Sequence, residues 1–294
     1  MPADRRPSAN GNPRKRGGGA PQGRDEGRGR GGPGGRGGPQ RGSSSAGRPS
    51  DRRERPDRRD AESRSDSQAK YDGPPIPEAI TGKELDRNVY AQLKGLPEKL
   101  AARVARHLAA AGMIIDEDPR TAYEHTLAAR ARAARVAIVR EACGEAAYAA
   151  GEYAEALSEL RAARRMNGVN DYLPIMADCE RALGRPDRAL KLAQSPSVPN
   201  LPVGLKAEMT IVEAGARRDR GEVDAALRTL EQAPLSSTHR ESWVARLRYA
   251  YADALLAAGR EEEALEWFHR ADAADREQAT DAAARAEQLE RDRG

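Results

Sequence analysis

Histidines and cysteines are the side chains of this 294-residue chain that most readily bind metals or act as nucleophiles, and they are few and scattered. Cys143 and Cys179 lie in separate apolar stretches, so we expect each to be a small buried side chain rather than a redox centre. No two histidines stand at a metal-ligand spacing, and we expect all four to be solvated or partly buried helix residues. The histidines are His107, His125, His239 and His269.

The carboxylates show no catalytic arrangement either. The run from Glu261 to Glu263 falls where we expect the first turn of a helix, and acidic side chains there complement the helix dipole. No phosphate-binding loop is recognisable in the sequence. The sequence therefore predicts that the chain is not an enzyme and that it uses neither a metal nor a cofactor.

Arginines near the N-terminus offer a different chemistry, which is contact with anions. Five Arg-Gly steps lie in a segment rich in glycine and proline, and this composition resembles the RGG tails of RNA-associated proteins. Guanidinium groups bind phosphates and stack on bases, so RNA contact is one hypothesis and a solubilising tail is the other. The arginines of these steps are Arg16, Arg28, Arg30, Arg36 and Arg41.

The same segment lacks the side chains that build a core. Residues 2–70 contain no Val, Ile, Leu, Phe, Trp, Tyr or Cys, so we expect residues 1–70 to be disordered. They hold 18 basic and 9 acidic residues, a net charge of +9, whereas residues 71–294 hold 32 and 37, a net charge of −5. A basic tail on a mildly acidic body is predicted, and a third hypothesis is that the tail folds back onto that body.

Membrane insertion and secretion are not expected from the sequence. No apolar run approaches the roughly 18 residues that a membrane span needs. The N-terminal arginines are not followed by the apolar stretch of a secretory signal, and two cysteines cannot form a disulfide framework. We therefore expect a cytoplasmic protein with no membrane partner.

Helices are the elements expected after the tail, because aromatic residues make up only 4% of the chain and no strand-like alternation occurs. Residues 71–81 form a proline-rich connector. Thr81 and Glu84 have the spacing of a capping box, which predicts that a helix starts there and ends at Gly95.

Residues 82–136 are expected to hold the N-terminal helices and a degenerate repeat. Pro97 should open a helix that Gly112 caps, and Asp118 followed by Pro119 should start the next. From Pro119 to residue 150 there is no Gly or Pro, so the segment is either one long helix or two helices with a tight turn near residues 132–135. We favour two helices, because a repeat needs the break.

The strongest pattern in the chain is a repeat marked by four glycines, 33, 37 and 38 residues apart. An Ala-Leu pair follows each glycine by five residues, and a small residue precedes each glycine by seven. The glycines are Gly151, Gly184, Gly221 and Gly259; the alanines are Ala156, Ala189, Ala226 and Ala264; the preceding small residues are Gly144, Ala177, Ala214 and Ala252.

This spacing fits a hairpin of two helices, A and B. Glycine can end helix A in a left-handed conformation that side chains disfavour, and the small residues let the two helix backbones cross closely. One hairpin cannot bury its apolar face alone, so several copies should stack into a solenoid.

The first copy carries the fullest motif: Cys143, Gly144, Ala147, Tyr148, Gly151, Tyr153, Ala156, Leu160 and Ala163. This pattern resembles the tetratricopeptide repeat (TPR) of proteins from high-GC bacteria. The resemblance covers residues 137–275 as four repeats and implies an all-α, TPR-like solenoid of stacked helical hairpins. Residues 276–294 resemble the solvating helix that ends such a solenoid.

Departures from the family pattern mark expected loops. Gly168 stands where the family has a closing proline, and the early bulky aromatic residue of helix A is missing from the first three copies. The connections after the second and third copies are long, so we expect loops at residues 195–201 and 234–238.

In TPR proteins the helix A surfaces line a concave groove for an extended peptide or a partner helix. The residue after each small position should face this groove, and three of the four are acidic: Glu145, Asp178 and Asp253, with Gly215 as the fourth. An acidic groove with tyrosines suits a basic partner, whereas a solvated charged face is the alternative. The groove residues predicted are Glu141, Glu145, Tyr148, Asp178, Arg181, Arg218, Tyr249 and Asp253.

Two functions follow as hypotheses. The first is a non-catalytic scaffold that binds a protein partner, a peptide or a helix, through the concave surface. The alternative is an RNA-associated factor whose Arg/Gly tail contacts phosphates while the solenoid recruits protein. The partner's identity and the oligomeric state do not follow from the sequence.

Overall fold

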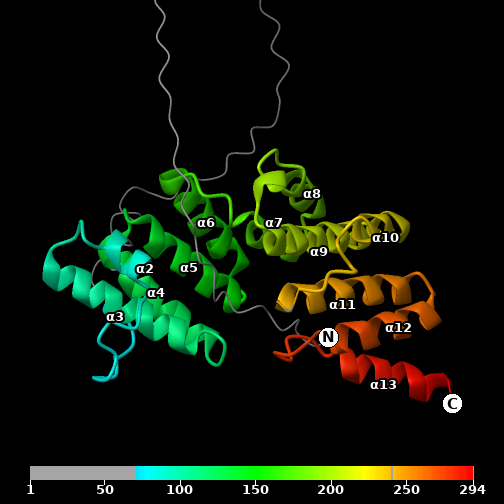
Figure 1. Ribbon diagram of the computed structural model, residues 1–294. Coiled ribbons are helices and arrows are strands. Elements are labelled where there is room, and N and C mark those ends of the chain that lie inside the picture. Colours follow the sequence, from blue (N-terminus) through cyan, green and yellow to red (C-terminus); the bar gives the residue numbers. More distant parts are fainter. Residues whose placement is uncertain (1–70, 240, 294) are drawn as a thin grey trace, which may run out of the picture. The chain divides into compact units, whose positions relative to one another are not determined.

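The computed structural model describes residues 71–239 and 241–293, and every regular element in these ranges is helical. The predicted all-α class is confirmed for this part of the chain (Figure 1). The predictions for residues 1–70, disorder and the Arg-Gly steps, lie outside the described residues. The helices are α2 (Arg87–Gln92), α3 (Glu98–Ile114), α4 (Pro119–Ala133), α5 (Ala137–Ala149), α6 (Tyr153–Asn167), α7 (Leu173–Ala182), α8 (Pro186–Ala193), the 3₁₀ turn η1 (Val198–Asn200), α9 (Val203–Asp219), α10 (Val223–Glu231), α11 (Ser242–Ala257), α12 (Glu261–Asp272) and α13 (Ala282–Arg293).

Consecutive helices pack as antiparallel hairpins, each against the next along the chain. The pairs are α3 with α4, α5 with α6, α7 with α8, α9 with α10, and α11 with α12, and α13 packs on α12. The first helices of successive hairpins also contact one another, α5 with α7, α7 with α9 and α9 with α11. We call α5, α7, α9 and α11 the A helices and α6, α8, α10 and α12 the B helices.

The four repeat glycines all adopt the predicted left-handed conformation. Their φ angles lie between 71° and 81°, and each ends the turn between an A helix and its B helix. Gly168 closes α6 in the same conformation, with φ 68°, and its N–H donates to the carbonyl of Arg164. A side chain would be strained at these positions, so glycine fixes where each A helix ends.

The helix crossings are made by small residues, as predicted. The four repeat alanines of the B helices are at most 1% exposed, and none faces solvent. On α5, a Cβ added to Gly144 would lie 2.6 Å from Cγ of Leu160 on α6, so the two backbones approach too closely for any side chain there. Leu160 is itself fully buried and fills the space beside the crossing.

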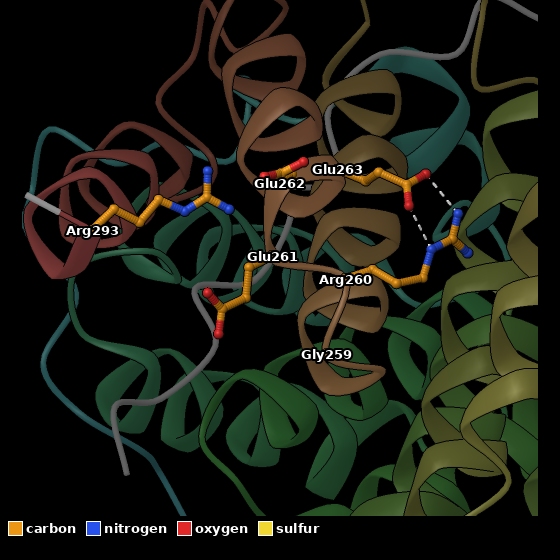
Figure 2. A pocket seen from close by; sticks show the side chains of 6 residues that line it. All are labelled: Gly259, Arg260, Glu261, Glu262, Glu263 and Arg293. Atoms are coloured by element: carbon orange, nitrogen blue, oxygen red, sulfur yellow. Dashed lines mark hydrogen bonds and ion pairs between the residues drawn. The ribbon is translucent and has the colours of Figure 1, made fainter.

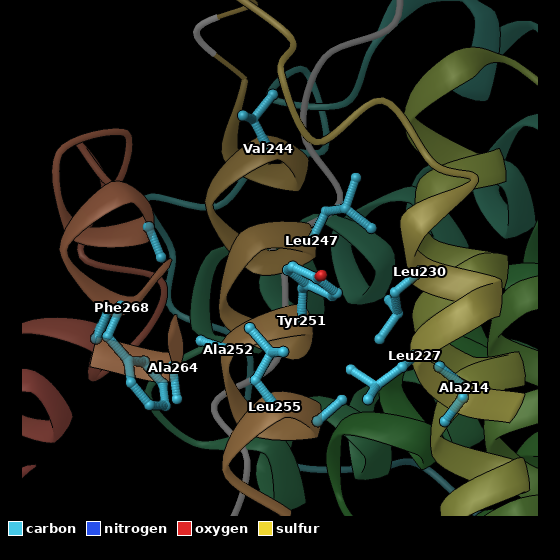
Figure 3. Close-up of a cluster of buried hydrophobic side chains, with 14 of the residues drawn as sticks. Ala214, Leu227, Leu230, Val244, Leu247, Tyr251, Ala252, Leu255, Ala264 and Phe268 are labelled. Atoms are coloured by element: carbon cyan, nitrogen blue, oxygen red, sulfur yellow. The ribbon is translucent and has the colours of Figure 1, made fainter. Parts of the chain in front are cut away.

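The last two hairpins and α13 share one apolar core (Figure 3). Leu227 and Leu230 of α10 face Leu247 and Leu255 of α11, and Phe268 of α12 packs on the other side of α11. Leucines at helical spacing thus bury one face of α11 against α10. This core extends into α13 through its buried residues Ala282, Ala286 and Leu289.

Two buried carboxylates join neighbouring hairpins, and the sequence analysis did not identify them. Glu159 on α6 is 4% exposed and accepts from Arg130 of α4 at 2.5 Å and from Arg140 of α5 at 2.6 Å. Glu180 on α7 is 1% exposed and pairs with Arg161 of α6 at 2.6 Å. Ion pairs of this kind hold the stacked helices in register.

Several predicted boundaries needed correction. The first helix starts at Arg87, because Asp86 accepts from the N–H of Asn88, while the Thr81–Glu84 hydrogen bonds close a turn ahead of it. The helix ends at Gln92, short of the predicted Gly95. Gly112 was predicted to cap a helix but lies inside α3, which continues to Ile114.

Other boundaries agree with the sequence. Asp118 caps α4, and α4 ends at Ala133 while α5 begins at Ala137, so this segment is two helices as favoured. Both predicted loops are present, the first with the short η1 turn inside it. The terminal helix starts at Ala282 rather than directly after the fourth repeat, because Asp275 accepts from the N–H groups of Ala279 and Thr280 and holds a loop.

Candidate partner-binding face

The eight predicted groove residues all lie on the A helices. Glu141, Glu145 and Tyr148 are on α5 at a spacing of four and three residues, which places them along one side of that helix. Asp178 and Arg181 are on α7, Arg218 is on α9, and Tyr249 and Asp253 are on α11. We call this set the A-helix face, because the helices that carry it contact one another in order.

Polar bonds link α5 to α7 and α7 to α9 across this face. The hydroxyl of Tyr148 donates to Oδ2 of Asp178 at 2.5 Å. Arg181, which also bonds to Asp178 at 3.1 Å, donates through Nε to Asp219 of α9 at 2.8 Å. Gly215 leaves space for this arginine, since a Cβ there would lie 2.8 Å from its Cζ. The predicted groove position at Gly215 is therefore filled by Arg181.

A second set of bonds links α9 to α11 and α13. Arg218 donates to Oδ2 of Asp253 at 2.6 Å, and Arg285 of α13 donates to Oδ1 of the same carboxylate at 3.1 Å. Burial and a hydrogen bond to Asp281 raise the pKa of Tyr249 above its usual value. Asp178 and Asp253 are thus already neutralised by arginines, which the prediction of an acidic groove did not include.

The α5 end of the face is different at Glu145. Among the described residues no Lys or Arg forms an ion pair with Glu145, which is half-buried. Burial, together with the charge of Glu141, raises the pKa of the Glu145 carboxyl to about 8. Tyr172 donates to Oε2 of Glu141 at 2.6 Å and itself accepts from Asn167 at 2.8 Å. A cation placed beside Glu145 would favour the ionised form of its carboxyl.

A surface depression of about 540 Å³ lies at the start of α12, and none of the eight predicted groove residues lines it (Figure 2). It is lined by Gly259, Arg260, Arg293 and the run from Glu261 to Glu263. Arg260 donates to both oxygens of Glu263, at 2.7 and 2.6 Å, which lowers the pKa of that carboxyl. These acids complement the helix dipole, as expected, and the arrangement contains no nucleophile with a base beside it.

The structure brings two of the four histidines together, which the sequence analysis did not predict. Nδ1 of His107 on α3 lies 3.1 Å from Nδ1 of His125 on α4, and both residues are buried. The expectation that they are solvated or only partly buried was wrong. The sequence does carry one indication of this contact. His107 and His125 are equally far along the chain from the turn at Asp116, so the two helices of the hairpin place them opposite each other.

The cysteines are buried, as predicted. Burial raises the pKa of the Cys143 thiol to about 11, so the thiol stays protonated and is a poor nucleophile at neutral pH. Within residues 71–239 and 241–293, no group of three or more potential metal ligands gathers. In the same ranges, none of the helices has both the length and the apolar character required to span a bilayer.

Comparison of the chain with protein-family models, curated proteins and solved structures found no match. The predicted tail arginines lie outside the described residues.

Proposed function

We propose that this chain is a non-catalytic interaction scaffold of the tetratricopeptide type, which binds a partner peptide or helix through the A-helix face. The observation that carries the proposal is that four A helices in sequential contact present one row of polar side chains. The left-handed glycine turns and the small residues at the crossings support the family resemblance.

The links between A helices suggest how such a face would work. Bonds from Tyr148 to Asp178 and from Arg218 to Asp253 fix neighbouring hairpins relative to each other, so the row is ordered before a partner arrives. A preordered surface loses less entropy on binding than a flexible one. Recognition of charge then falls on the α5 end, where Glu145 favours a partner with an Arg or Lys side chain.

Affinity purification with the full chain tests this role through Glu145. Because the pKa of Glu145 is about 8, recovery of a basic partner should rise roughly tenfold between pH 7 and pH 9 as the carboxylate ionises. E145Q should remove this pH dependence, and E145K, which is cationic at both pH values, should lower recovery roughly tenfold at pH 7 and by a larger factor at pH 9. Bound partners are quantified by mass spectrometry.

The matched control is E155K, which makes the same substitution at an exposed position of the B helix α6. Its recovery should equal that of the wild type. Equal loss in E145K and E155K would show a non-specific charge effect and refute a site on the A-helix face. Nuclease treatment of half of each sample separates proteins that bind directly from proteins that are bridged by RNA. Bridging by RNA is what the alternative function, an RNA-associated factor, predicts.

A further inference from the structure

The contact between His107 and His125 lies in the interior of the first hairpin, between α3 and α4. The two residues are 1% and 3% exposed, and their Nδ1 atoms are 3.1 Å apart. Only one hydrogen fits between two nitrogens at this distance, so one ring donates and the other accepts, and the accepting ring must be neutral. The Nδ1 lone pair of the accepting ring takes part in this hydrogen bond, so a proton added to that nitrogen would break it.

Residues 71–82, which we call the N-terminal strap, pass beside this pair at Gly73. A Cβ added to Gly73 would be 2.6 Å from Cβ of Ala128 and 3.2 Å from Cε1 of His107. Arg132 of α4 donates to the carbonyl of Tyr71 at 2.6 Å, and Arg106 of α3 donates to the carbonyl of Ile80 at 2.6 Å. The strap is thus held by arginines of the same two helices that carry the histidines.

The charged groups around the pair oppose a further positive charge. Arg103 and Arg106 reach it from α3 and Arg132 from α4, while Glu124 of α4 has the opposite effect. Asp72 of the strap is already paired with Arg103 and Arg132. Burial, followed by the charges of His125 and the three arginines, lowers the pKa of His107 to about 4. Burial also lowers the pKa of His125.

Protonation would act in two steps. A first proton can enter at the outer nitrogen of the donating ring and leave the contact intact, but it buries a cation beside three arginines. A second proton on the accepting ring leaves two N–H groups facing each other, and the hydrogen bond is lost. Each step favours any state in which α3 and α4 separate and the rings reach water.

We propose that the His107–His125 contact is an acid-sensitive latch, whose protonation separates α3 from α4 and releases the N-terminal strap. The latch would therefore control whether residues 71–82 stay against α3 and α4. The folded-state pKa lies below the ordinary value of 6.5, so the stabilisation is complete above that value and is lost as the pH falls toward 4. This proposal is independent of the function of the A-helix face.

Hydrogen exchange of the full chain at pH 7.5 and pH 5.0, corrected for intrinsic rates, tests the latch. Opening of the strap, α3 and α4 should increase roughly 30-fold at pH 5.0, given one histidine with a pKa of about 4 in the closed state and an ordinary one in the open state. Peptides of α11 and α12 should show no such increase. The double variant H107L/H125L should show no acid-induced opening, whereas H239Q should behave like the wild type.

Equal acid-induced opening in the wild type and the double variant would overturn the latch, because other acids would then be responsible. No opening in the wild type, or opening of all helices together, would also overturn it. Imidazole NMR titration of the wild type needs no variant to fold. Titration of His107 near pH 4, with His125 also titrating below its ordinary value, supports the proposal, and titration of both at the ordinary value of about 6.5 refutes it.

Discussion

Replacing Glu159 by glutamine should lower the free energy of unfolding by about 3–5 kcal/mol, the range for removing one partner of a buried ion pair. The Glu159 carboxylate is almost fully buried and pairs with Arg130 at 2.5 Å and Arg140 at 2.6 Å. A neutral amide would leave two guanidinium groups partly buried without a counterion. The measurement is urea-induced unfolding followed by circular dichroism.

Two controls separate charge loss from a general effect of mutation. E155Q makes the same change at an exposed position of the same helix and should alter stability by less than about 0.5 kcal/mol. The triple variant R130M/E159M/R140M removes all three charges, so it should cost far less than E159Q alone. A triple variant that is less stable than E159Q would show that the ion pairs themselves carry the stability.

Replacing Phe268 by alanine should have a similar effect, about 3–5 kcal/mol, because it leaves a cavity where α11, α12 and α13 meet. Phe268 is fully buried. Its ring centre lies 5.4 Å from that of Tyr249 on α11, and the guanidinium of Arg285 on α13 lies 5.2 Å from it. The loss is measured from the shift of the urea midpoint at unchanged slope.

The control for this cavity is F268L, which keeps most of the volume and should cost about 1.5 kcal/mol or less. Tyr249 and Arg285 both contact this ring. F268A should therefore also weaken the hydrogen bond from Arg285 to Asp253 on the A-helix face. Equal losses for F268A and F268L would contradict the importance of packing volume at this position.

Much of the fold could be predicted because residues at fixed positions in each repeat identify the hairpin turns and the helix crossings. A glycine every 33 to 38 residues locates the hairpin turns, and the alanine five residues later locates the crossing. The helix starts were less certain where two capping residues compete. Thr81 and Asp86 both suit an N-cap; in the structure the helix begins after Asp86, whose side chain accepts from the N–H of Asn88, while Thr81 and Glu84 close a separate turn.

The sequence predicted which helices carry the groove residues, but it did not predict the net charge of the face that they form. The register placed the groove residues on the A helices, yet it did not show that arginines neutralise two of the aspartates. The bonds join Tyr148 to Asp178, Arg181 to Asp219 and Arg218 to Asp253, at separations of 30, 38 and 35 residues. These separations are close to one repeat, so opposite charges one period apart are the signal to look for.

The buried histidines show a different limit of the sequence. His107 and His125 lie 18 residues apart on two helices whose ends were uncertain, and Gly112 was expected to end α3 early. An error of a few residues in the turn moves the two rings to different faces, because helix faces repeat every 3.6 residues. Pairing of side chains within the first hairpin therefore required the structure.

Hydrogen exchange of the full chain with and without its purified partner tests most directly whether the A helices carry the binding. The proposed function predicts that partner binding slows exchange in peptides covering α5, α7, α9 and α11, most strongly around Glu145, and leaves the exposed sides of the B helices unchanged. Protection confined to the B helices, or to residues 1–70 alone, would contradict it.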